Sequence, residues 1–64
     1  MRIKYIPEVG DTVVDREGQI GEIDTVWNDD GKDRVRIRWP SGILTGDPAG
    51  DWEWNFYSEC WEPS

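Results

Sequence analysis

The chain has 64 residues, one cysteine, no histidine and a net charge of −7, which leaves few ways to stabilise a fold. A domain this small buries only about 60% of its unfolded surface and often depends on disulfides or a metal. Because Cys60 is the single thiol, an intrachain disulfide is excluded, and no zinc site is expected without histidine. We therefore expect the five tryptophans to supply much of the core of one domain spanning residues 1–64.

The sequence also predicts a cytoplasmic location. A free thiol without a disulfide fits a reducing compartment. The opening residues "MRIKYIPEVG" lack the apolar region of a signal peptide, and no apolar run approaches the ~20 residues of a membrane span.

Turn signals come about every eight to twelve residues, and no window shows helical periodicity, which predicts a small all-β barrel or sandwich. The first expected strand covers residues 11–15, with Val13 facing inward. The second covers residues 20–27, where apolar residues of both parities occur. A regular strand would bury only one of these sets, so we expect a β-bulge or a strong bend near Glu22 to Thr25. The polar stretch "NDDGKD" then predicts a hairpin loop. It does not match the spacing of a calcium-binding EF-hand loop.

The stretch "RVRIRW" predicts a half-buried strand, because Val35, Ile37 and Trp39 alternate with three arginines. We expect Trp39 in the core, and Trp27 in the core or at the end of the barrel. A short strand should cover residues 43–45, followed by an irregular loop through the glycines and proline of residues 46–50.

Near the C-terminus, "WEWNFY" predicts a strand over residues 52–57. A short turn should then return Trp61 to the body of the domain.

The order of these pieces resembles the SH3-like small barrels of the KOW, Tudor and mind-bomb type. The resemblance covers residues 9–45, where "GD-x-V", "G-x-I" and "V-x-I-x-W-x-x-G" patterns follow one another. The matching positions are Gly10, Asp11, Val13, Gly21, Ile23, Val35, Ile37, Trp39 and Gly42. The resemblance implies a small barrel of about five antiparallel strands. It leaves the ligand open, since such barrels bind proteins, modified lysines or nucleic acids, or brace larger proteins.

Composition argues against catalysis. General acid–base chemistry at neutral pH usually uses histidine or a carboxylate with a tuned pKa, and the chain has no histidine. Cys60 lies between Glu59 and Trp61 without an evident base, which does not favour a reactive thiolate. We expect a non-enzymatic protein with no cofactor and no metal.

Charge is distributed unevenly along the chain. Residues 1–40 hold nine acids and seven bases, whereas residues 41–64 hold five acids and no base. This acidic and aromatic third predicts a surface for a basic partner protein, on which aromatic side chains anchor and carboxylates steer. The predicted aromatic–acidic patch comprises Trp52, Trp54, Tyr57 and Trp61, rimmed by Asp47, Asp51, Glu53, Glu59 and Glu62. In size and charge the chain resembles small inhibitors of the phage or mobile-element type, which occupy a nucleic-acid site on their target.

Two alternatives remain open at this stage. The first is a nucleic-acid face formed by Lys32, Arg34, Arg36 and Arg38. Against it, arginines on such a strand pair readily with acids on neighbouring strands, and this interpretation is favoured. The second is a structural domain that self-associates through its aromatic residues, as a homodimer. An aromatic cage would require Trp61 to fold back over the strand that carries Trp52 and Trp54.

Overall fold

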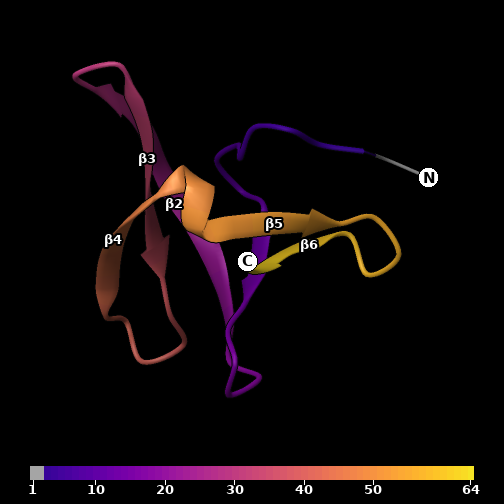
Figure 1. The fold of residues 1–64 in the computed structure, drawn as a ribbon. Coiled ribbons are helices and arrows are strands. Elements are labelled where there is room, and N and C mark those ends of the chain that lie inside the picture. Colours follow the sequence, from indigo (N-terminus) through magenta and orange to yellow (C-terminus); the bar gives the residue numbers. More distant parts are fainter. Residues whose placement is uncertain (1–2) are drawn as a thin grey trace.

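The computed structural model describes residues 3–64, and nearly all of its regular structure is β-strand. The elements in chain order are β1 Thr12–Val14, β2 Ile20–Asp29, β3 Lys32–Arg38, β4 Leu44–Pro48, the 3-10 helix η1 Ala49–Asp51, β5 Trp52–Asn55 and β6 Cys60–Pro63. The strands form one sheet in the order β4-β3-β2-β1-β6-β5. The sheet curls, so that β5 and β6 run at a steep angle to β2 and β3 (Figure 1). The predicted all-β class is confirmed, and the curl is compatible with a small barrel.

The hairpin of β2 and β3 confirms the two most local predictions. The register shifts between Ile23 and Thr25, which is the β-bulge expected from the mixed parity of this strand. The turn at its tip places Asp30 and Gly31 at positive φ, of 53° and 81°. Aspartate and glycine tolerate this backbone conformation, and two such residues in succession suit the right-handed twist of a hairpin.

One strand pair departs from the antiparallel arrangement that we expected. β1 runs parallel to β6, with Val13 opposite Trp61, and β6 lies between β1 and β5. The stretch "SECWEPS" is therefore a turn followed by a strand, which brings the count to six. Trp61 does return to the body of the domain, as predicted, because β6 pairs with both neighbours.

The core is small and centres on Val13, Ile23, Val35 and Ile37, which are all at most 1% exposed. Each was predicted to face inward. Trp61 joins them, and the partly buried side chains that pack against this cluster are Val26, Trp39, Ala49, Trp52 and Trp54. The indole of Trp39 also donates from Nε1 to Oγ1 of Thr45, over 2.7 Å. By contrast, the prediction that Trp27 lies in the core is wrong, because its side chain is 39% exposed and lies outside the core cluster.

Close packing between β2 and β3 requires glycine at position 21. A methyl group there would lie 2.8 Å from Cε3 of Trp39, 2.9 Å from Cγ2 of Ile37 and 3.0 Å from the carbonyl oxygen of Arg38. All three distances are below those of normal contacts. Gly21 therefore allows Trp39 to lie against the backbone of β2.

The region after β3 is more regular than the sequence indicated. The prediction of an irregular loop is wrong for residues 46–48, since Gly46 pairs with Arg36 and Pro48 with Arg34 in β4. An edge strand tolerates both residues, because its outer backbone groups need no partner within the sheet. The predicted strand over residues 52–57 ends earlier, at Asn55, and Phe56 lies in the following turn.

A polar network joins the N-terminal segment to β6. Nζ of Lys4 contacts Oδ1 of Asp11 and lies 2.8 Å from Oε1 of Glu8 and 5.5 Å from the ring centroid of Trp54. Oδ2 of Asp11 accepts from the indole Nε1 of Trp61 over 3.0 Å. Burial alone would raise the pKa of Asp11, but hydrogen bonds from Lys4, Trp61 and the amide of Glu8 outweigh it and lower the pKa.

Among residues 3–64, no helix has the length and apolar character needed to cross a membrane.

Candidate protein-binding surface

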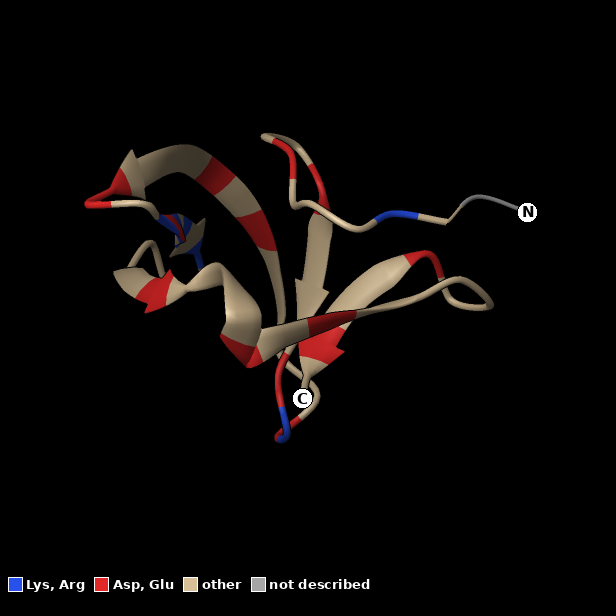
Figure 2. Ribbon diagram, turned by 45° about the horizontal axis from the view of Figure 1, so that its top comes forward, with Lys and Arg blue, Asp and Glu red and all other residues tan. Residues whose placement is uncertain are grey.

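Two adjoining grooves contain most of the residues of the aromatic–acidic patch. The larger, here called the acidic groove, is lined by Asp15, Arg16, Glu17, Asp47, Asp51, Trp52, Pro63 and Ser64. The smaller, here called the hairpin groove, is lined by Glu53, Trp54, Asn55, Phe56, Tyr57, Glu62 and Pro63. Pro63 borders both, so the two grooves form one surface. The ribbon from β4 to β6 carries red bands and no blue ones (Figure 2).

The acidic groove brings together carboxylates from distant parts of the chain. Asp47 lies on β4 opposite Val35, and Asp51 lies in η1. Asp15 follows β1, where its Oδ1 accepts hydrogen bonds from the amides of Glu17 (3.0 Å) and Gln19 (2.8 Å). These bonds fix the tight turn that places Asp15 and Glu17 across from β4. Arg16 is the one basic side chain among the described residues that line this groove.

In the hairpin groove, two glutamates face each other directly. Glu53 on β5 is paired in register with Glu62 on β6. Like charges in directly opposed positions of an antiparallel pair are destabilising. Nδ2 of Asn55 donates to Oε1 of Glu62 over 3.2 Å, which orients that carboxylate without neutralising it. No ion pair within residues 3–64 involves either glutamate.

The predicted role of Trp61 as an exposed anchor is wrong. Its side chain is only 3% exposed, because β6 lies inside the sheet and the indole packs in the core. The ring of Trp54 meets it edge-on, with centroids 5.3 Å apart. Trp61 contacts one side of Trp54, and Nζ of Lys4 lies 5.5 Å from the centroid of the Trp54 ring, so this pair does not present a free aromatic cage.

The remaining aromatic side chains differ in exposure. Trp52 and Trp54 are partly buried and present only part of their rings to the grooves. Trp52 packs at 6.3 Å from Trp39, and its Nε1 is buried without a hydrogen-bond partner among the described residues. Tyr57 is 78% exposed and stacks on Phe56 at 4.3 Å, in the same turn as exposed Glu59. Tyr57 is therefore the most accessible aromatic anchor of the patch.

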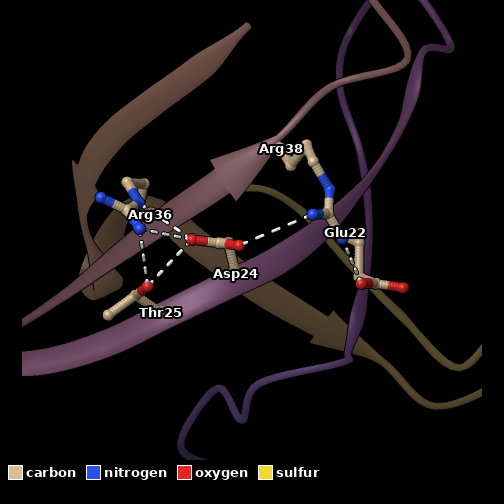
Figure 3. Close-up of polar contacts among 5 residues, drawn as sticks. All are labelled: Glu22, Asp24, Thr25, Arg36 and Arg38. Atoms are coloured by element: carbon tan, nitrogen blue, oxygen red, sulfur yellow. Dashed lines mark hydrogen bonds and ion pairs between the residues drawn. The ribbon is translucent and has the colours of Figure 1, made fainter. Parts of the chain in front are cut away.

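Two of the three arginines of β3, Arg36 and Arg38, pair with acids of β2, as cross-strand pairing predicted (Figure 3). Nη2 of Arg36 lies 2.6 Å from Oδ2 of Asp24, and Nη2 of Arg38 lies 3.1 Å from Oε1 of Glu22. Nη1 of Arg38 also approaches Oδ1 of Asp24 at 3.8 Å. Hydrogen bonds from Arg36 and Thr25 lower the pKa of Asp24, so this carboxylate stays ionised beside the two guanidiniums.

Arg34 and Lys32 complete the basic set on β3, and no ion pair within residues 3–64 involves them. Asp24 and Glu22 thus offset two of the four positive charges that a phosphate backbone would need. The arrangement favours the structural interpretation of this strand over a nucleic-acid face.

Asp15 and Glu17 line the acidic groove but were not predicted to belong to the acidic surface. Both belong to the stretch "DREG", which has the local signature of a turn and nothing more. Their position opposite Asp47 depends on the curl of the whole sheet, which no local pattern encodes.

Metal and thiol chemistry find no support at this surface. Across residues 3–64, no cluster of three or more potential metal ligands is arranged to hold an ion. Cys60 is buried, with its Sγ 3.1 Å from Oγ of Ser58.

Comparisons with models of protein families, with curated proteins and with solved structures found no match to this chain.

Proposed function

We propose that this chain is a non-enzymatic protein-binding module that docks its acidic surface on a basic surface of a partner protein. The observation that carries the proposal is the concentration of six carboxylates along the two adjoining grooves, with Arg16 as the single cation lining them in the described chain. The repulsion between Glu53 and Glu62 is left uncompensated within the described residues. Cations supplied by a partner would relieve it and would speed the encounter of the two proteins.

The exposed ring of Tyr57 and the accessible parts of Trp52 and Trp54 would supply apolar contact beside the carboxylates. Interfaces commonly combine aromatic anchors with a charged rim in this way. A partner surface that normally binds a phosphate backbone is the basic surface that fits best, because it already gathers cations. On such a target the module would act as an inhibitor that competes with nucleic acid.

The proposal is tested by two variants that each replace two carboxylates by amides and therefore carry the same net charge. In one variant, Asp51→Asn and Glu53→Gln remove two carboxylates from the grooves. In the control, Asp29→Asn and Asp30→Asn remove two from the tip of the β2–β3 hairpin. Each variant is immobilised beside the wild-type protein and used to capture proteins from an extract of the native host.

We expect basic proteins to be captured by the wild type and the control, to be lost from the groove variant, and to be displaced by added DNA or RNA. Equal capture by both variants would overturn the proposal. Direct binding of labelled RNA or DNA by the wild type, abolished by Arg34→Ala, would instead support the nucleic-acid alternative.

A further inference from the structure

The backbone of β4 is open on one side. β4 ends the sheet and pairs only with β3. The amide of Trp39 donates to the carbonyl of Ile43 over 2.9 Å, so these two residues are a hydrogen-bonded pair at the start of the β3–β4 ladder. Because the bonds of an antiparallel pair alternate, the N–H and C=O groups of Leu44 and Gly46 point away from β3. No other hydrogen bond within residues 3–64 uses these groups.

Little protects this edge from pairing with another strand. Natural edge strands are usually guarded by charge, proline or a covering segment. Gly46 has no side chain, and an added methyl group would find no heavy atom closer than 4.0 Å. Leu44 is 48% exposed on the outer face and Ile43 is 61% exposed on the inner face, so an apolar side chain lies beside the open backbone groups on each side. Pro48 blocks pairing only at the far end of the strand.

A groove accompanies the edge on its inner side. It is bordered by Asp15 and Gln19 from the β1–β2 turn, by Trp39, and by Ile43, Thr45 and Asp47 along β4. Asp15 and Asp47 also line the acidic groove, so the open edge continues the surface described above. A strand added to β4 would direct alternate side chains towards these two carboxylates. The intervening side chains would lie beside Leu44 on the outer face.

We propose that β4 binds an extended segment of the partner protein by strand addition, and that basic and apolar residues alternate along this segment. The inference rests on the proposed function for the sign of the partner's charge, and it adds the mode of binding. Charge also argues against a second copy as the occupant. Each chain carries a net charge of −7, so edge-to-edge pairing of two copies would be opposed by repulsion between like charges.

The test uses a labelled peptide of about ten alternating lysine and valine residues, and the same peptide with every backbone amide methylated. Both peptides carry the same charge, but the methylated one cannot form a ladder. We expect the methylated peptide to bind the wild-type protein about tenfold more weakly or worse, since several backbone hydrogen bonds are lost. We also expect the unmodified peptide to shift the amide resonances of Leu44 and Gly46.

Two variants at one position test the same point from the protein side. Gly46→Pro removes an outward N–H without breaking a bond to β3, whereas the control Gly46→Ala keeps that N–H. We expect Gly46→Ala to bind the unmodified peptide like the wild type and Gly46→Pro to lose binding. Should Gly46→Pro not fold, the methylated peptide still decides the matter.

Strand addition is overturned if both peptides bind equally, or if folded Gly46→Pro binds unchanged. If Asp47→Asn/Asp51→Asn loses peptide binding and methylation of the peptide has no effect, the proposed function of the acidic surface is supported and strand addition is refuted. If methylation weakens binding and Asp47→Asn/Asp51→Asn binds unchanged, strand addition is supported and the requirement for basic residues in the bound segment is refuted. Sedimentation that shows a wild-type dimer abolished by Gly46→Pro would assign the edge to a second copy and overturn the proposal.

Discussion

Replacing Gly21 with alanine is the most direct test of how the core is closed. The new methyl group would lie within 3.0 Å of side-chain atoms of Trp39 and Ile37 and of the backbone oxygen of Arg38. Overpacking of this kind costs about 1–3 kcal/mol. We expect the upper end, because Arg38 is tied into the β2–β3 ladder and cannot move alone. A domain of this size is stabilised by roughly 3–10 kcal/mol in all, so the loss is a large fraction of the total.

Urea unfolding followed by tryptophan fluorescence, with circular dichroism as a second probe, measures the effect. A loss near 3 kcal/mol corresponds to a fall in Tm of roughly 12–24 °C for a small domain. The matched control is Gly50→Ala, since Gly50 has no heavy atom within 4 Å of its added methyl group and does not adopt positive φ. We expect this control to be unchanged or stabilised by about 0.4–1 kcal/mol. Equal midpoints for the two variants would refute the packing of Trp39 against β2.

Two further predictions concern the polar network. Trp61→Phe removes the donor to Asp11, and leaving this partly buried carboxylate short of one hydrogen bond should cost about 1–3 kcal/mol beyond the lost ring area. Trp52→Phe removes an Nε1 that has no partner among the described residues, so the urea midpoint of this variant should fall less. An equal fall in both variants would contradict a stabilising role of the hydrogen bond between Trp61 and Asp11. The lowered pKa of Asp11 means that its stabilising contribution is present above the ordinary value of 3.8 and is lost as pH falls through the lower value of the folded state. Unfolding midpoints should therefore fall more steeply in acid for the wild type than for Asp11→Asn, and parallel curves would argue against this role for Asp11.

The elements predicted from the sequence are those determined by neighbouring residues. Alternation in "RVRIRW" identified Val35 and Ile37 as core residues, and the mixed parity of β2 revealed its bulge. Both patterns are imposed on a strand by its own pleat, so they are visible in one short segment. The cross-strand pairing of Arg36 and Arg38 was predicted for the same reason, because the preceding strand in the chain supplies the acids.

The features that the sequence did not predict depend on contacts between distant segments. The aromatic residues of "DWEWNFYSECW" did not reveal that Trp61 would lie between β1 and β5, since this position follows from the parallel pairing of β1 and β6. The acidic groove likewise combines Asp15 with Asp47 through the curl of the sheet. Composition correctly indicated where acidic side chains would concentrate, but topology decided which of the aromatic residues remained accessible.

The pairing of β1 with β6 also constrains how the chain can fold. Trp61 bonds to Asp11 across 50 positions of sequence, whereas β2, β3 and β4 are joined by short hairpins. Closing so long a loop is entropically costly and is repaid only when both ends have arrived. A nascent chain that has not yet extended past β5 therefore lacks both the ring that completes the core and the donor for Asp11. Formation of the hairpins is therefore expected to precede this closure.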